Sequence, residues 1–405
     1  MRIFLYLFLA ILLPACKSYE AKTYDFPKPV DTTTRPITKQ TKKLYELPDG
    51  IYADNQFDGA RLNNIEQTAP HKLRADIDPE NTPINKSPYY AFRLWADESQ
   101  TVEVELNYSY SRHRYPPKIS RDGENWELLD EAKVRLAADT VNAFLELELE
   151  ANDTLWVAAQ ELQTSSHVRE WCEAQSLHPA VQLSSIGKSR EGRDLWCLDI
   201  GTGEAKKKDI IVVLGRQHPP EVTGWFAMKA FVEELLAEHA LATRFAERYR
   251  ILVFPLLNPD GVDLGHWRHN TGGIDLNRDW GYYNQPEVRA VANYVVETVG
   301  RNRSNVILGL DFHSTYWDIY YTNRETPEQI PEFKDYWLMG ISETLGEPTN
   351  EKPSFLGGPV SKNWIYTQFG APGITYEIGD STPRDFIRRK GQVSAQEMMQ
   401  LLILR

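Results

Sequence analysis

The run IIVVLGRQHPPE, residues 210–221, is the most informative stretch of this 405-residue chain. Its first five residues are all apolar, which predicts a strand buried on both faces, as the strands of parallel sheets are. The polar turn that follows brings His218 and Glu221, and the stretch from 222 to about 239 then has the apolar spacing of a helix. A buried strand, a polar turn and a helix in this order indicate an α/β unit whose turn carries reactive groups.

Three more apolar runs end in polar residues in the same way. Residues 251–256 lead into NPDG and WRHNTGGIDLNRDW, residues 306–310 lead into DFHST with His313, and residues 374–376 lead into Glu377. In an open parallel sheet the ligand crevice lies outside the carboxyl ends of the strands, so we expect these polar residues to meet there. Residues 162–405 are therefore predicted to form an α/β domain, with a mixed, mainly parallel sheet covered by helices on both faces.

The chain before residue 162 has a different pattern. Within residues 50–161, apolar and polar residues alternate at 102–110 and again at 145–150, and Asp-Gly at 122–123 marks a turn. Half-buried strands joined by frequent turns predict a small all-β sandwich domain. Residues 17–49 are rich in Thr, Pro and Lys and have no apolar periodicity, which predicts a flexible tether.

Residues 1–16 have the features of a bacterial export signal. Arg2 precedes an apolar run at 3–13 that is too short to cross a bilayer comfortably, and LPAC at 13–16 resembles the lipobox, where cleavage leaves a cysteine for lipidation. We therefore expect a mature chain that is anchored through lipidated Cys16 at the bacterial cell envelope, on the periplasmic face of the outer membrane. The alternative is an ordinary secretory signal in which the cysteine is incidental.

Composition limits the partners more than the compartment. The chain has 45 basic and 57 acidic residues and a formal net charge of −12, which excludes a nucleic-acid partner because phosphate binding requires a basic surface. Cys172 and Cys197 leave two interpretations open, a disulfide in an oxidising compartment or two buried thiols. The sequence also leaves the oligomeric state open.

His218, Glu221 and His313 form the candidate metal site. A catalytic zinc site uses nitrogen and oxygen donors and keeps a position open for water, and two histidines with one carboxylate are such a set. His218 and Glu221 lie three residues apart on a turn that leads into a helix, so both can face one point. A His-x-x-Glu pair alone is weak evidence, because an acidic residue at a helix start also favours the helix dipole. The prediction of one zinc ion per chain therefore depends on His313 reaching the same edge from another strand.

The order of these motifs resembles the zinc carboxypeptidases of the carboxypeptidase A type, especially the branch that includes the cytosolic carboxypeptidases. The resemblance covers about residues 185–380, where SIGKSREGR, RQHPPE, NPDG, WRH, DLNRDW, DFHS and TYEIGD occur in the order of the family. YYAFRLW at 89–95 is also similar to the small β-domain of that branch. The resemblance implies the zinc carboxypeptidase fold and the release of C-terminal amino acids from peptides.

The same resemblance implies a role for each motif residue. His218, Glu221 and His313 would hold the zinc ion, and Glu377 would be the catalytic glutamate. Physical chemistry agrees with this assignment, since a carboxylate on a separate strand can take a proton from water and deliver it to the leaving amine. Asp275 is expected to accept a hydrogen bond from the second ring nitrogen of His218.

Three further residues of these motifs would bind the substrate. Arg268 corresponds to the arginine that polarises the scissile carbonyl, and its fixed charge suits a developing oxyanion. Asn277 and Arg278 correspond to the residues that grip the terminal carboxylate, for which the planar guanidinium fork is well suited.

Two positions bear on specificity. In this family a residue some fifteen positions before the catalytic glutamate lies at the base of the side-chain pocket, and that position is Lys362 here. A buried lysine needs a counter-charge, which an acidic side chain of the substrate would supply; the alternative is a lysine that points to solvent. The tyrosine with which the family closes over its substrate corresponds to Phe355 in an ungapped count, so a hydroxyl at that point is in doubt.

Other functions compete with peptide hydrolysis. An amidase or carboxypeptidase acting on peptidoglycan stem peptides fits an envelope location, and a deacylase of N-acyl amino acids would share the metal motif. From a different class, an inactive lipoprotein could bind ligands in the same cleft. The NPDG, WRH and TYE motifs favour the peptidase, and the complete set of metal and acid–base residues argues against an inactive protein.

Overall fold

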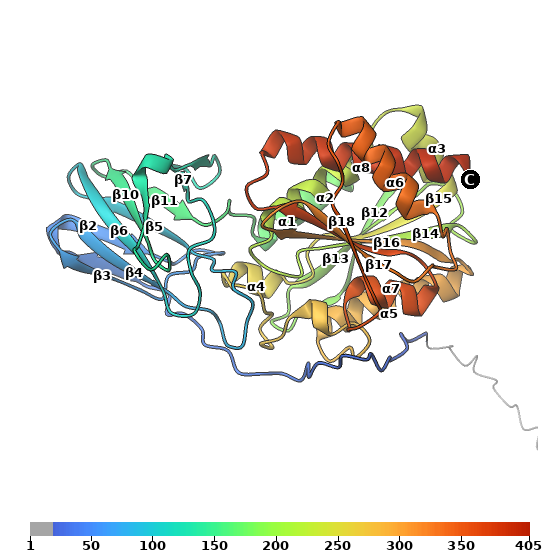
Figure 1. The fold of residues 1–405 in the computed structure, drawn as a ribbon, viewed down its shortest axis with the longest axis horizontal. Helices are drawn as coiled ribbons and strands as arrows, with labels where there is room; N and C mark the ends of the chain where they lie inside the picture. The colour runs from blue at the N-terminus through green and yellow to red at the C-terminus, as the bar shows by residue number, and fades with distance from the viewer. Residues whose placement is uncertain (1–18) are drawn as a thin grey trace, which may run out of the picture.

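The computed structural model describes residues 19–405, so the predicted export signal and Cys16 lie outside the described residues. Figure 1 shows two parts side by side, a smaller one built of strands and a larger one in which helices flank a sheet. No helix within residues 19–405 has the length and apolarity needed to cross a membrane.

The smaller part is a sandwich of two sheets. One sheet has the strand order β1 (Leu44–Leu47), β2 (Ile51–Asp54), β5 (Ala91–Ala96), β11 (Leu155–Ala158), β7 (Lys118–Ser120) and β8 (Glu127–Leu128). The other has the order β3 (Asn64–Ala69), β4 (Lys72–Ile77), β6 (Gln100–Tyr108), β10 (Ala143–Leu149) and β9 (Val134–Leu136). The alternating residues of β6 and β10 place their apolar side chains between the sheets, as the period of two predicts.

The larger part contains an eight-stranded mixed sheet. Its order is β12 (Val181–Lys188), β13 (Asp194–Ile200), β15 (Tyr249–Phe254), β14 (Asp209–Gly215), β16 (Val306–Thr315), β19 (Gly373–Gly379), β17 (Ile319–Asn323) and β18 (Glu351–Ser354). The four central strands β15, β14, β16 and β19 are parallel, and the strands that border them, β13 and β17, pair antiparallel with β15 and β19. This arrangement confirms the predicted mixed sheet with a parallel centre.

Helices cover both faces of this sheet, as Figure 1 shows. The helices that pack on one face are α1 (Ser165–Gln175), α2 (Val222–Leu235), α3 (Ala240–Arg248), α6 (Phe333–Leu345) and α8 (Arg384–Leu404). The helices on the other face are α5 (Pro286–Asn302) and α7 (Ser361–Phe369), and the short α4 (Pro259–Asp263) follows β15. Successive residues of β14 alternate between the two cores, which explains why its sequence is continuously apolar.

The N-terminal segment, residues 19–43, differs from the expected flexible tether over 17–49. It has no regular secondary structure, yet it runs along the larger part beside α5 and α7 (Figure 1). Phe26 is buried, the Tyr24 hydroxyl donates to the carbonyl of Thr367 at 2.9 Å, and Thr32 Oγ1 donates to Asp279 Oδ1 at 2.6 Å. The rest of the expected tether contains β1, which belongs to the sandwich. Single anchors of this kind hold a segment without giving it a periodic pattern.

Cys172 and Cys197 are two free, buried thiols. Cys172 on α1 belongs to the core on one face of the sheet, and Cys197 on β13 belongs to the core on the other face. The sheet therefore lies between the two sulfur atoms, and of the two interpretations left open the structure supports the buried thiols.

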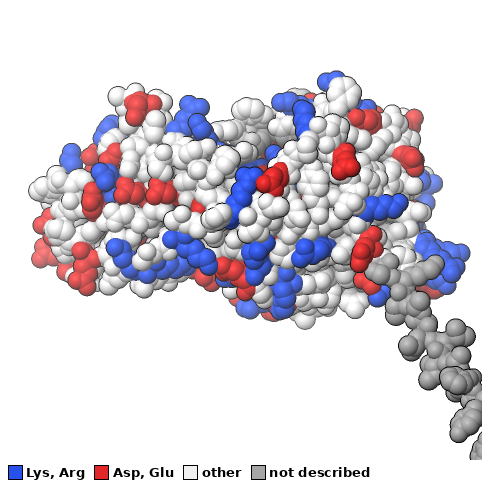
Figure 2. Space-filling view, turned by 90° about the horizontal axis from the view of Figure 1, so that it is seen from below, with Lys and Arg blue, Asp and Glu red and all other residues white. Residues whose placement is uncertain are grey.

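Charged side chains are mixed on the face drawn in Figure 2, which is seen from below the view of Figure 1. Lys and Arg side chains lie on both sides of the junction between the two parts, with Asp and Glu side chains among them. The net charge of −12 is therefore not gathered on this face.

Candidate active site

A cleft of about 780 Å³ lies over the carboxyl ends of the central strands. Its lining contains the predicted metal ligands, Glu377 and Lys362 from the larger part. The sandwich contributes residues 84–87 and Arg114, and the N-terminal segment contributes Lys28. The site is thus built from three separate stretches of the chain.

The three predicted metal ligands lie together. One ligand atom from each of His218, Glu221 and His313 can be chosen so that all lie within 4.8 Å of one another. Glu221 Oε1 is 2.7 Å from His218 Nδ1, and Glu221 Oε2 is 2.7 Å from His313 Nδ1. Two imidazoles and a carboxylate that face one point are the donor set of a catalytic zinc site, so these residues fit a zinc ion.

Close packing of helix α2 against strand β16 brings these ligands together. Glu221 is the residue just before α2, and His313 lies within β16. The backbone N–H of Gly224 in α2 donates to Ser314 Oγ in β16 at 2.8 Å. A side chain at residue 224 would clash with the His313 backbone, so a glycine is required for this close approach of helix and strand.

Each histidine is oriented by a second carboxylate. His218 Nε2 is 2.8 Å from Asp275 Oδ1, which confirms the predicted contact, and His313 Nε2 is 2.7 Å from Asp311 Oδ2. Such carboxylates fix the ring orientation and leave the other nitrogen free for a metal ion. Asp311 is not among the site residues predicted from the sequence. Its signal is the Asp-x-His spacing, since alternate residues of a strand share a face.

The charges of His218, Glu221 and His313, called the metal group below, depend on one another. Burial alone would raise the pKa of Glu221, but the neighbouring imidazoles of His218 and His313 outweigh it and lower that pKa. Burial would lower the pKa of His313, but Asp311 and Glu221 raise it. The site therefore favours an ionised carboxylate that is surrounded by positive charge, and a divalent cation would supply the same charge.

Glu377 lies opposite His313 in the pairing of β16 and β19. The sequence predicts Glu377 in a loop after the strand, but the residue lies inside β19. Its Oε2 atom is buried and has no hydrogen-bond partner within residues 19–405. Burial raises the pKa of Glu377 above its usual range, which suits a group that must both accept and release a proton.

Arg268 is held beside the metal group. Its Nε donates to Asp275 Oδ2 at 2.7 Å, and its Nη1 lies 3.9 Å from Glu221 Oε1. Asp275 thus contacts both Arg268 and His218, so one carboxylate aligns a metal ligand and the arginine.

The two residues predicted to bind a terminal carboxylate differ in their freedom. Arg278 lines the cleft with its side chain 37% exposed, and its Nη1 donates to the carbonyl of Asn277 at 2.7 Å. Asn277 also lines the cleft, but its Oδ1 accepts from the Ser361 backbone at 2.9 Å and its Nδ2 lies 3.3 Å from His313 Nε2. Arg278 is therefore the more available of the two.

Lys362 lies in the wall of the cleft and not in solvent. It is buried at the start of α7, and its Nζ donates to the amide oxygens of Asn323 and of Asn363, the latter at 2.9 Å. No carboxylate within the described residues forms an ion pair with it. Burial lowers its pKa to about 8, against the opposing field of Glu325.

Phe355 also lines the cleft, 67% exposed and stacked under the guanidinium of Arg324 at 4.6 Å. The position that an ungapped count assigned to the family tyrosine is thus at the cleft. It has no hydroxyl.

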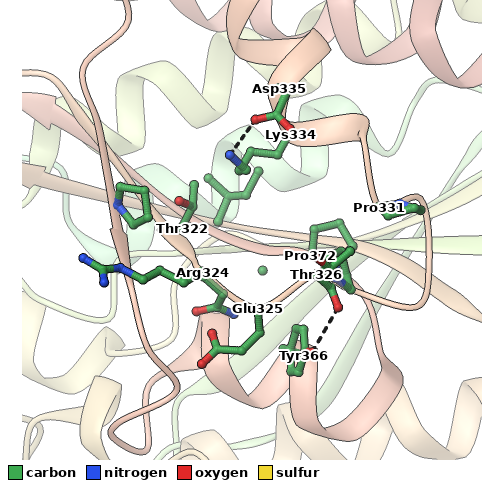
Figure 3. Close-up of a pocket in the computed structure, with 14 residues that line it drawn as sticks. Thr322, Arg324, Glu325, Thr326, Pro331, Lys334, Asp335, Tyr366 and Pro372 are labelled. Atoms are coloured by element: carbon green, nitrogen blue, oxygen red, sulfur yellow. Dashed lines mark hydrogen bonds and ion pairs between the residues drawn. The ribbon is translucent and has the colours of Figure 1, made fainter.

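A second cavity, of about 380 Å³, is lined by residues 322–327 together with Lys334, Tyr366 and Pro372 (Figure 3). Its charged groups include Lys334, which forms an ion pair with Asp335 at 2.6 Å, and the Tyr366 hydroxyl donates to the carbonyl of Thr326 at 3.1 Å. None of the metal, acid–base or carboxylate-binding residues lines it. The candidate active site is therefore the larger cleft.

A family model described as zinc carboxypeptidase matches residues 168–394. The chain is 24% identical over 253 residues to an uncharacterized protein of Zymomonas mobilis, covering 60% of this chain and 63% of that protein. It is 29% identical over 136 residues to cytosolic carboxypeptidase 6 of Mus musculus, covering 32% of this chain and 25% of that protein. The chain thus spans less than two thirds of the length of these curated relatives.

A solved structure has a similar fold over most of the chain. The metallo-carboxypeptidase of Pseudomonas aeruginosa, in complex with (2-guanidinoethylmercapto)succinic acid, has a TM-score of 0.71 at 20% sequence identity. The similarity covers 87% of this chain and 100% of that chain. At this identity the likeness concerns the fold alone, and it confirms the predicted fold class.

Proposed function

The chain belongs to the zinc carboxypeptidase family, and from that premise we propose that it hydrolyses the C-terminal peptide or isopeptide bond of peptides. The observation that supports this most is the convergence of His218, Glu221 and His313, with Glu377 opposite His313 in the same cleft. His218 and Glu221 come from the turn between β14 and α2, whereas His313 and Glu377 come from β16 and β19.

The proposed mechanism gives each side chain one task. A zinc ion, when bound, supplies Lewis-acid polarisation and lowers the pKa of water toward about 7. Glu377 takes the proton of the attacking water and later delivers it to the leaving amine. Arg268 holds a fixed positive charge, aligned by Asp275, where negative charge develops on the carbonyl oxygen.

Arg278 is proposed to bind the carboxylate at the end of the substrate. It lines the cleft and is partly exposed, and within residues 19–405 its guanidinium donates one hydrogen bond, to the carbonyl of Asn277, and lies 3.8 Å from Asp275 Oδ2. A bidentate pair between its guanidinium and a carboxylate would favour chain ends over internal bonds. This pairing distinguishes an exopeptidase from an endopeptidase.

Lys362 is proposed to select acidic side chains at the substrate's C-terminus. Its ammonium group is buried in the cleft wall, and its hydrogen-bond acceptors among residues 19–405 are amide oxygens, so its charge is solvated but not neutralised there. A carboxylate of a C-terminal Glu, Asp or diaminopimelate residue would supply the missing counter-charge. The proposal includes peptidoglycan stem peptides, which an envelope location would make available.

The test is to incubate the purified, zinc-loaded protein with a peptide library, with purified peptidoglycan fragments and with N-acyl amino acids. Mass spectrometry of the products should show loss of single C-terminal residues from peptides. Release only of stem-peptide fragments or of acyl groups would favour the corresponding alternative.

The control is His313→Ala. This variant should bind much less than one equivalent of zinc and should lose hydrolysis, because one of the three donor groups is removed. Full zinc occupancy in the variant would remove His313 from the proposed site, and turnover without zinc in the wild type would contradict the mechanism.

A further inference from the structure

Glu80 of the sandwich contacts the loop that carries Arg268. It is fully buried and lies just after β4, 187 residues before Trp267. Its Oε2 accepts from the backbone N–H of Trp267 at 2.7 Å, and its Oε1 accepts from those of Arg268 at 3.0 Å and His269 at 2.6 Å. Three successive N–H groups of one loop thus converge on one carboxylate, in the manner of an anion-binding backbone nest.

A carboxylate is the acceptor that this loop requires. Three buried N–H donors need several lone pairs, which an ionised carboxylate supplies and an amide does not. The Arg61 guanidinium lies 3.6 Å from Glu80 Oε2 and is itself buried, so Glu80 also balances its charge. Removal of the Glu80 charge would leave the loop donors and Arg61 without their shared partner.

Other contacts fix the same loop to the sandwich. The Trp267 side chain is fully buried in the core of the sandwich, although it belongs to the larger part of the chain. Asn81 Oδ1 is 2.6 Å from His269 Nδ1, and Asn81 Nδ2 donates to the carbonyl of Gly273 at 3.1 Å. The residues on both sides of Arg268 are therefore placed by the smaller domain.

We propose that Glu80 is a positioning residue for hydrolysis, because it fixes the backbone of Arg268 from the sandwich while Asp275 fixes its guanidinium. This inference rests on the proposed function, in which Arg268 stabilises charge on the carbonyl oxygen. Glu80 is not among the residues that line the cleft, so the proposed effect on hydrolysis is exerted through Arg268. The sandwich is thereby part of the catalytic apparatus and more than an appended module.

The first experiment compares Glu80→Gln with a matched control, Asp54→Asn. Asp54 is a buried carboxylate of the same sandwich that pairs with Arg93 at 2.8 and 2.6 Å and has no contact with the loop. With zinc-loaded enzymes, Glu80→Gln should lower kcat at least about tenfold with little change in KM, since Arg268 acts mainly in the transition state. Asp54→Asn should keep the kcat of the wild type.

Two readouts separate positioning from a general loss of structure. Hydrogen exchange of the amides of Trp267, Arg268 and His269 should quicken in Glu80→Gln and not in Asp54→Asn. In an Arg268→Ala background, Glu80→Gln should change kcat less than about twofold, because the group through which it acts is already absent. If Glu80→Gln does not fold, Glu80→Asp, which keeps the charge opposite Arg61 but retracts it from the loop, takes its place in both measurements.

The outcomes distinguish this inference from the proposed function. A wild type without carboxypeptidase activity would contradict the proposed function itself. An active wild type with a Glu80 variant of equal kcat would overturn only the role of Glu80. If the losses in kcat caused by Glu80→Gln and by Arg268→Ala multiply in the double variant, the role of Glu80 is also overturned, because Glu80 then acts by a route that does not involve Arg268.

Discussion

The proposed role of Lys362 predicts that a preference for acidic C-terminal residues depends on pH. Burial lowers the pKa of the free ammonium group to about 8. With that value the group is about nine-tenths protonated at pH 7 and about one-tenth protonated at pH 9. The pH dependence of kcat/KM reports the pKa values of the free enzyme. We expect the ratio of kcat/KM for a peptide ending in Glu to that for one ending in Leu to fall about tenfold between these pH values.

The direction of this pH dependence follows from the protonation state of Lys362 that binds the substrate. The protonated ammonium attracts the substrate carboxylate, so the preference is present below about pH 8 and is lost above it. Titration of Glu377 and of the metal group affects both peptides alike and cancels in the ratio. The assay is a set of steady-state rates on the two peptides at half-unit steps from pH 6.5 to about 9.5, a range that spans the Lys362 pKa.

Lys362→Met is the matched variant, because it keeps an unbranched side chain of similar length without the charge. Loss of one partner of a buried charge pair costs about 2–5 kcal/mol, so kcat/KM for the Glu peptide should fall at least about 30-fold. The Leu peptide should be little affected, and the ratio should no longer change with pH. A ratio in the wild type that is flat across this range, or a variant with unaltered preference, would refute the reasoning.

Three further results are expected. Glu377→Gln should still bind zinc but turn over at least about a hundredfold more slowly, and an unchanged kcat would assign proton transfer to another group. Asp311→Asn should weaken zinc binding about 10- to 100-fold in chelator competition, because His313 loses its charged acceptor, whereas equal affinity would make Asp311 merely structural. Mass spectrometry of membrane-extracted protein should show an acylated Cys16 after removal of residues 1–15, and an unmodified mature chain in the soluble fraction would reject the anchor.

The central strands and the metal group could be predicted because two independent patterns coincide. Runs such as 210–214 are short and apolar at every position, as a strand buried on both faces requires. Polar residues directly after them must then meet at one edge of the sheet. The ends of the strands were less predictable, since His313 and Glu377 interrupt the apolar runs although both lie inside strands.

The contacts between distant segments could not be predicted. Thr32 meets Asp279 and Glu80 meets Trp267 through single hydrogen bonds, and nothing in the composition of either segment marks its partner. The N-terminal segment therefore has the sequence of a tether but is fixed to the larger part. Asp311 is a different case, because its spacing from His313 was visible and only its significance was not recognised.

The two free thiols make the fold indifferent to redox conditions. The thiolate is the form that reacts with oxidants, and burial raises the pKa of Cys172 to about 12 and that of Cys197 well above its usual value. Neither sulfur atom is exposed, and the sheet separates them. Residues 19–405 can therefore reach the same native core in the reducing cytoplasm of an expression host or in an oxidising compartment, without an oxidant or a disulfide isomerase. Oxidants and thiol-blocking reagents should therefore leave the core of residues 19–405 unchanged.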